Sequence, residues 1–439
     1  MSGIRCLVLA LLVGFGPAVA AAAESPASAE GAFTIEACHE KARANYPLAR
    51  QYAFIDAARG MDLAIAKRGY LPRLNLSGKA SYQSDVTSLD SLASSLPPAM
   101  ASALSSVGAA KDQYQALAEI TQTIWDGGAI KAQLRSIGSS SRVERGKLDV
   151  DLYAVYDRVD QLFFGILAFR EQLKQNDLLL DDLDSSYRRV EASLRNGIAS
   201  PYDLDAVRVE VFNAKQKRTE LSAAEKSERE MLAAMLGESL PEGTVFAMPD
   251  ASAPLPSEDR RLRPEFGLFE AQKALCDSQE IAVRAANMPR LSAFFQTAYA
   301  EPGLNMFKSG FAGYWLGGLK LSWSLNGLLD LKDQLGKIGA SRREIEAQED
   351  AFALNNGVQA IRDRNDIEKL RELLRGDDEI IALRLSMRAS TEGKLENGVA
   401  TTDDVLKAID AESLARQAKS LHEVQLAMAA YALKNTLGR

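Results

Sequence analysis

The chain of 439 residues repeats its own sequence motifs about 200 positions apart. Residues 130–134, Ile-Lys-Ala-Gln-Leu, return at 331–335 as Leu-Lys-Asp-Gln-Leu. Residues 196–199, Asn-Gly-Ile-Ala, return at the same spacing as Asn-Gly-Val-Ala at 397–400. The fold must therefore be built from one supersecondary unit that is used twice. The two structural repeats are predicted at 24–263 and 264–439.

Each repeat contains a very long segment with the apolar period of a helix. From Leu148 to Leu194 apolar residues recur every three or four positions, which is the heptad seam of a coiled-coil-like helix. No proline interrupts the segment, so 129–196 is predicted to be one helix of about 100 Å, too long for a compact globule. Its counterpart is predicted at 328–397.

One polar residue stands at the same place in each seam, Asn176 in the first repeat and Asp377 in the second. Such a residue is either tolerated or sets the register between helices, and the sequence leaves both readings open. The remaining helices are shorter. They are predicted at 34–68, 202–236, 265–286 and 403–436.

Between the short and the long helix of each repeat the apolar period changes to two residues. In 74–83 apolar or small residues alternate with polar ones, which is the pattern of a strand. Similar strands are predicted at 113–125, 290–300 and 314–325, each of the length of a tilted membrane-spanning strand. They form two hairpins, 74–125 and 290–325. Aromatic residues placed as for a membrane-interface girdle, or alternatively as core aromatics, are Trp125, Trp315, Trp323, Tyr82 and Tyr299.

The number of strands limits what one chain can do in a membrane. An open sheet edge in hydrocarbon leaves backbone groups unpaired at a cost of several kcal/mol each, so a spanning sheet must close. The smallest bacterial barrels have about eight strands, and this chain offers four. Either two or three chains combine their strands, or the hairpins never meet lipid.

The chain begins with the pattern of a secretory signal. Residues 1–23 contain a short basic region, an apolar stretch and an alanine cluster suited to signal peptidase. Cys38 and Cys276 then remain as incidental helix residues rather than a disulfide scaffold. The formal net charge of −7 argues against a nucleic-acid partner, which requires a basic surface.

Patterns of catalytic chemistry are absent from the sequence. The two histidines, His39 and His422, lie far apart on predicted helices, where exposed positions are expected. There is no nucleophile triad, metal-ligand spacing, phosphate loop or dinucleotide fingerprint. We therefore expect no enzyme activity, no cofactor and no metal.

Several short motifs together resemble the TolC-like outer membrane efflux protein family. Each motif is weak alone, but the combination is specific and extends over the whole mature chain. The motifs are Thr-Ile-Glu-Ala at 34–37, Asn-Tyr-Pro at 45–47, Leu-Pro-Arg-Leu at 71–74, Ile-Trp-Asp-Gly-Gly at 124–128, Arg-Pro-Glu at 263–265, Met-Pro-Arg-Leu at 288–291 and the two Asn-Gly turns.

This resemblance implies an α+β membrane protein that forms a homotrimer. Each chain would give four strands to a 12-stranded β-barrel in the outer membrane of a Gram-negative bacterium, in contact with outer membrane lipid. The barrel would continue into a long periplasmic α-helical barrel. Such proteins are passive exit ducts of tripartite efflux or type I secretion systems. They receive substrate from an inner-membrane pump of the RND, ABC or MFS type through a periplasmic membrane-fusion adaptor.

The resemblance also assigns roles to the turns between the long and short helices. The turns that would contact the adaptor are Asn196, Gly197, Ile198 and Ala199 in the first repeat and Asn397, Gly398, Val399 and Ala400 in the second. Asp203 and Asp404 would narrow the periplasmic aperture, although each is equally explained as a carboxylate favoured at a helix start. Leu395, Ala400 and Lys407 stand where the family places gate-tying Tyr, Arg and Asp. Lys407 is expected to pair with Asp404 instead.

The alternative hypothesis is a periplasmic coiled-coil scaffolding protein without a pore, in which the hairpins pack on one another. The transported substrate is not indicated by the sequence. The Ser- and Ala-rich segment 85–112, which makes the first hairpin longer than the second, is expected to be an external loop.

Overall fold

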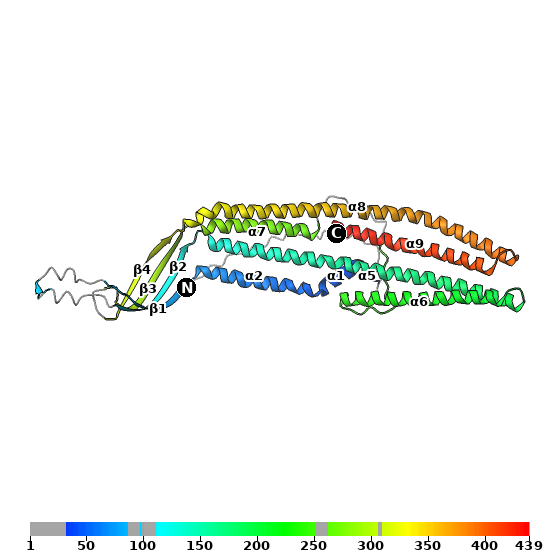
Figure 1. Ribbon diagram of the computed structural model, residues 1–439, viewed down its shortest axis with the longest axis horizontal. Helices are drawn as coiled ribbons and strands as arrows, with labels where there is room; N and C mark the ends of the chain where they lie inside the picture. The colour runs from blue at the N-terminus through cyan, green and yellow to red at the C-terminus, as the bar shows by residue number, and fades with distance from the viewer. Residues whose placement is uncertain are drawn as a thin grey trace, which may run out of the picture.

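The computed structural model describes residues 32–86, 97–98, 100, 111–250, 262–305 and 310–438. The predicted signal peptide at 1–23 and most of the predicted loop at 85–112 lie outside these residues. The molecule is elongated, with a β-sheet at one end and a layer of long helices running away from it (Figure 1).

Both long helices are present at their predicted places. They are α5, Ala129–Arg195, with 67 residues, and α8, Asn326–Glu396, with 71 residues. At 1.5 Å per residue each is about 100 Å long. The shorter α-helices are α1 (Ile35–Asn45), α2 (Gln51–Lys67), α6 (Pro201–Leu236), α7 (Pro264–Ala286) and α9 (Thr402–Leu437).

The single helix predicted over 34–68 is wrong. α1 ends before Tyr46, whose backbone is extended, and the short 3₁₀-helices η1 (Pro47–Arg50) and η2 (Arg68–Tyr70) flank α2. The cause is Pro47, because a proline ring disfavours the helical conformation of the residue before it.

The strands form one antiparallel sheet in the order β1-β2-β3-β4. Their bounds are β1, Arg73–Tyr82; β2, Asp112–Trp125; β3, Arg290–Glu301; and β4, Ala312–Ser322. They lie within two residues of the predicted starts, but β4 ends before Trp323. The β2–β3 pair joins the two repeats, and within the sheet β1 and β4 each keep one edge without a neighbour.

The pairing register gives the sheet one apolar and one polar face. Leu74 lies opposite Ile120, which in turn lies opposite Phe295 on the next strand. Further apolar side chains follow on this face, and several are about 70% exposed: Leu76, Trp315, Leu319 and Leu321. The other face carries Asn75, Lys79, Gln115, Glu119, Gln296 and Lys320.

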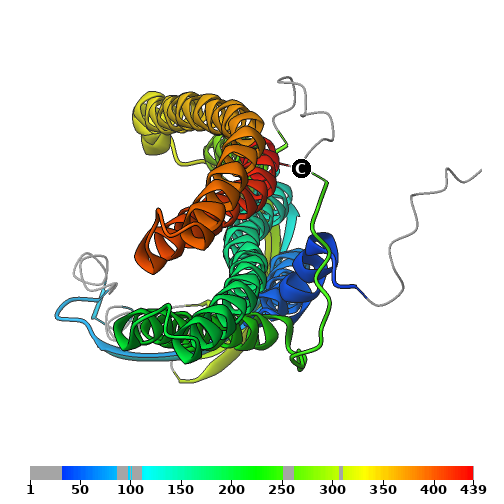
Figure 2. The same ribbon diagram turned by 90° about the vertical axis from the view of Figure 1, so that its right-hand side faces the viewer.

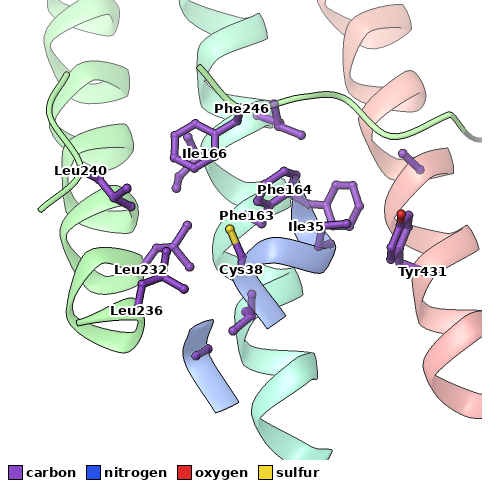
Figure 3. Close-up of a cluster of buried hydrophobic side chains, with 14 of the residues drawn as sticks. Ile35, Cys38, Phe163, Phe164, Ile166, Leu232, Leu236, Leu240, Phe246 and Tyr431 are labelled. Atoms are coloured by element: carbon purple, nitrogen blue, oxygen red, sulfur yellow. The ribbon is translucent and has the colours of Figure 1, made fainter. Parts of the chain in front are cut away.

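The largest hydrophobic core lies midway along the helices. Phe163 and Phe164 of α5 are buried between Ile35 and Cys38 of α1 on one side and Tyr431 of α9 on another (Figure 3). Leu232, Leu236, Leu240 and Phe246 close this core from α6 and the segment that follows it. Both cysteines are buried and free, and burial raises the pKa of Cys38 to about 12.

The expectation that both histidines are exposed is wrong. His39 Nε2 lies 2.5 Å from Asp160 Oδ1, and only 13% of the His39 side chain is exposed. His422 Nδ1 lies 2.7 Å from the buried Asp377 Oδ2, which joins α9 to α8. In both cases a buried aspartate of a long helix, Asp160 or Asp377, gives the half-buried imidazole a polar partner.

Asn176, at the place in the first repeat that Asp377 occupies in the second, is 1% exposed. Its side-chain amide donates to the carbonyl oxygen of Ala214 on α6 at 3.1 Å. Each polar seam residue thus fixes its long helix against the next helix. Of the two readings left open by the sequence, the contacts favour the setting of helix register.

Candidate functional site

The far ends of the helices form two turns of the same design. Asn196 and Asn397 end α5 and α8, and the following Gly197 and Gly398 have φ of +70° and +75°. In the first turn the N–H of Ile198 donates to the carbonyl of Ser193 at 2.9 Å. A left-handed glycine with this backward bond is the usual helix stop, so the repeated Asn-Gly motif encodes both turns.

Each turn presents one apolar side chain to its surroundings. Ile198 is 82% exposed and Val399 is 77% exposed, and Tyr202 follows on the first turn of α6. Exposed branched apolar side chains at the tip of a rigid helical hairpin are suited to contact with another protein. The turns lie together at the end of the molecule opposite the sheet (Figure 1).

Asp203 and Asp404 take part in helix capping. The N–H groups of Ser200 and Thr401 donate to Asp203 at 2.8 Å and to Asp404 at 2.9 Å, while the hydroxyls of Ser200 and Thr401 accept from the aspartate N–H groups. Hydrogen bonds from Ser200 hold the pKa of Asp203 below its usual value, and those from Thr401 do the same for Asp404. Within one chain both carboxylates cap the starts of helices, which is one of the two roles that the sequence predicted for them. Their place at an aperture remains a prediction.

The sequence reasoning did not identify the Ser200 and Thr401 partners. Their signal is local and readable, because Ser or Thr followed three positions later by an acidic residue is the pattern of a capping box. The expected pair between Lys407 and Asp404 is wrong. Lys407 Nζ instead lies 2.6 Å from Oδ2 of Asp403, four positions earlier on the same helix face.

An ionic cluster near the tips joins the two hairpins. Arg388 of α8 donates two hydrogen bonds to Asp182 of α5, at 2.8 and 2.9 Å, and a third of 3.1 Å to Glu412 of α9. The hydrogen bonds to Asp182 raise the pKa of Arg388 above its usual value. Glu412 is also bound by Arg416 at 2.6 Å and is almost fully buried. No local motif indicates this cluster, because Asp182 and Arg388 are 206 positions apart.

The predicted interface aromatics lie at two levels of the sheet. Trp125 ends β2 and Trp323 follows β4, at the end near the helices, where the Trp323 indole donates to Asn287 O at 3.1 Å. Tyr82 ends β1 at the far end, and Tyr299 with Trp315 lie close to it. All five side chains are between 48% and 72% exposed, so none of them is a core aromatic of the single chain.

Among the residues that the structure describes, no helix is both long and apolar enough to cross a membrane. Within the same residues no group of three His, Cys, Asp or Glu side chains is placed to hold a metal ion.

Comparison with known proteins gives a family and a fold. The model of the outer membrane efflux protein family matches residues 39–238. The outer-membrane channel OprN has 17% identity and a TM-score of 0.69, covering 92% of this chain and 89% of its own. CusC has 15% identity and a TM-score of 0.67, covering 92% of both chains. A comparison with curated proteins gave no match.

The outer membrane protein VceC of Vibrio cholerae shares the fold at 13% identity and a TM-score of 0.64, covering 92% of this chain and 96% of its own. At such low identities these structures establish the fold, and the sequence match over the first repeat adds the family. Residues 39–238 thus match the outer membrane efflux protein family, and the chain as a whole has the fold of solved channels of the Gram-negative outer membrane.

Proposed function

We propose that this protein is the outer membrane exit duct of a tripartite efflux or type I secretion system and that it acts as a homotrimer. The observation that carries the proposal is the four-stranded sheet. One face of it is apolar and exposed, the other is polar, and both outer edges lack a neighbour within the described chain. A sheet with these three properties is suited to lipid on one side, water on the other and further strands at each edge.

The free edges determine how copies must associate. β1 of one copy pairs with β4 of the next, and closure after three copies gives a 12-stranded barrel. The polar face, with Asn75, Lys79 and Gln296, then lines a water-filled lumen. Trp315 and Trp323 are eight positions apart on one strand line, about 26 Å at the usual rise. This distance is close to the roughly 25 Å apolar band of outer membrane barrels.

The helices supply the complementary surfaces for the same ring. α8 exposes an apolar stripe on one face, in two groups separated by polar residues, and α2 with α6 exposes another stripe. Figure 2 shows α8 at one end of the curved helical layer and α6 at the other, so the stripes of neighbouring copies meet head to tail. The α8 stripe is Leu354, Val358, Ile361, Leu383 and Met387; the opposing stripe is Phe54, Met61, Ile65, Val209 and Phe212.

The tips define the partner end of the duct. The turns at 196–199 and 397–400 contact a periplasmic membrane-fusion adaptor, which connects the duct to an inner-membrane pump of the RND, ABC or MFS type. Ile198 and Val399 provide apolar contacts, and a neighbouring groove of about 500 Å³ between α8 and α9 contains Arg384, Lys394 and Lys407. The protein itself needs no catalytic chemistry, since substrate passes passively through the lumen.

The test is extraction of the native protein from outer membranes followed by reconstitution in planar bilayers. The proposal expects a detergent-stable trimer that conducts ions. A water-soluble monomer released by osmotic shock, without bilayer conductance, would instead support the periplasmic scaffold. Substitution of Ile198 and Val399 by Asp should abolish export in cells while leaving trimer formation and conductance unchanged.

A further inference from the structure

A basic hollow lies where the helices meet the sheet. A cavity of about 360 Å³ is formed between the start of α5 and the end of α7. Its charged lining residues are Lys131, Arg135 and Arg284, and its apolar wall includes Ile281 and Met288. The hollow is next to the membrane-facing strands, because β2 ends three positions before Gly128 and β3 begins two positions after Met288.

The backbone around the hollow depends on a close approach of two turns. Gly127 has φ of +68°, and a Cβ at this position would overlap the Cβ of Met288. The turn from β2 into α5 therefore lies directly on the turn from α7 into β3. Asp126 accepts hydrogen bonds from the N–H groups of Gly128 at 2.9 Å and Ile130 at 2.7 Å, which fixes the start of α5.

Two of the three cations in the hollow lack a counter-ion. Arg284 pairs with Glu280 at 2.6 Å on its own helix. Lys131 and Arg135 form no ion pair with any residue in the described parts of the chain. Unpaired cations lining a partly apolar hollow provide a site for an anion that carries an apolar group.

The surroundings of the hollow are also basic. The segments adjoining the helical end of the sheet contain nine Lys or Arg and five Asp or Glu residues, although the whole chain has a formal net charge of −7. These segments are 62–73, 126–135, 280–290 and 330–337. A basic belt at the level of Trp125 and Trp323 is what anionic headgroups at a membrane surface attract.

The hollow opens on the outer side of the helical layer. Lys131 and Arg135 lie on the face of α5 that continues, at helical spacing, to Arg142 and Arg145. That face meets Gly438 next to the chain end, and Figure 2 shows the C-terminus and α1 on the convex side of the layer. In a closed ring the convex side faces the surroundings of the duct, so lipid can reach the hollow.

We propose that the hollow formed by Lys131, Arg135 and Arg284 binds the phosphate of an anionic phospholipid from the periplasmic leaflet of the outer membrane. The acyl chains lie along the apolar sheet face above it, beside Trp125 and Leu291. This inference rests on the membrane-spanning duct proposed above. Bound lipid would hold the α5 and α7 ends at the membrane surface.

The experiment measures phospholipid binding to the purified, lipid-depleted trimer by native mass spectrometry. The probes are phosphatidylglycerol, phosphatidylcholine and inorganic phosphate. Phosphatidylglycerol should bind more tightly than phosphatidylcholine, and the preference should decline at high salt because the site is open to solvent. The double variant K131Q with R135Q should bind phosphatidylglycerol about 30-fold more weakly, since each basic residue near a membrane surface contributes about fivefold.

The matched control is K217Q with K226Q, which removes two exposed cations of α6 far from the hollow and from the basic belt and should leave binding unchanged. A photoreactive phosphatidylglycerol should label residues 126–135 and 281–288 of the wild-type trimer, which gives a reading even if the double variant does not fold. Equal loss in both variants, labelling only elsewhere, or equally strong binding of inorganic phosphate would overturn the lipid site. Failure of the duct is separable, because it would appear as absence of a conducting trimer.

Discussion

Single side chains control how the two hairpin tips are built. Ser200 with Asp203 and Thr401 with Asp404 make the same reciprocal cap at the start of α6 and α9. The cap needs an ionised carboxylate, because the aspartate accepts the hydrogen bonds. The negative charge of each aspartate therefore helps to keep the start of its helix, and with it the hairpin tip, in a fixed conformation.

The first prediction concerns pH. The pKa of Asp203 is lower in the folded chain than in the unfolded one, so its stabilising contribution is complete above about pH 4 and is lost as the pH falls through the folded value. Hydrogen exchange of the first turn of α6, corrected for intrinsic rates, should therefore accelerate below pH 4. D203N should abolish this pH dependence, and D205N, outside the cap, should keep it.

A second prediction concerns Gly127. G127A should destabilise the folded protein, because the alanine must adopt a positive φ and its Cβ would overlap Met288. G138A is the matched control, since no atom lies within 4 Å of its added Cβ and alanine in a helix is favoured by about 1 kcal/mol over glycine. Thermal unfolding should show a lower midpoint for the first variant only. Equal midpoints would contradict the close contact of the two turns.

At the scale of elements, polar contacts add to the apolar packing within and between the hairpins. Arg388 connects α8 to both α5 and α9, while Asn176 and the His422–Asp377 pair connect each long helix to its shorter neighbour. The apolar periodicity of the sequence placed both long helices, and it could not place these contacts. Arg388 meets Asp182 only when the two repeats pack side by side.

The third prediction tests this connection. R388L removes the cation between Asp182 and the nearly buried Glu412, and loss of one partner from such a cluster costs about 3 kcal/mol. Spin labels at positions 198 and 399 should then give a broader distribution of distances between the tips. R188L removes an exposed cation paired within its own helix and should leave the distribution unchanged. An unchanged distribution in R388L would show that apolar packing alone holds the hairpins together.

For the whole molecule, the unpaired surfaces decide the assembly. One chain leaves both sheet edges open and exposes apolar stripes along α8, α2 and α6. A monomer in water or in lipid would leave at least one of these surfaces unfavourably solvated. The ring of copies proposed for the duct covers all of them at once.

The fourth prediction concerns this ring. V358D with I361D places two charges in the α8 stripe and should increase the monomer fraction at least tenfold, because burial of an unpaired charge costs several kcal/mol. V245D introduces a charge at an apolar side chain that is equally exposed but outside both stripes, and it should not change assembly. Mass photometry of the detergent-solubilised protein measures the monomer fraction. Intact trimers in the stripe variant would exclude α8 from the interface.

The sequence by itself determined most of the elements, because helices and strands follow from the spacing of apolar residues along the chain. The periods of α5 and β1 are local, as are the Asn-Gly turns and the number of strands that one chain offers. Only the tertiary structure decided the pairing of β2 with β3, the contacts of His39 with Asp160 and of His422 with Asp377, and the partners of Arg388. These depend on which distant or competing groups lie within a few ångströms in three dimensions, and apolar spacing carries no information about that distance.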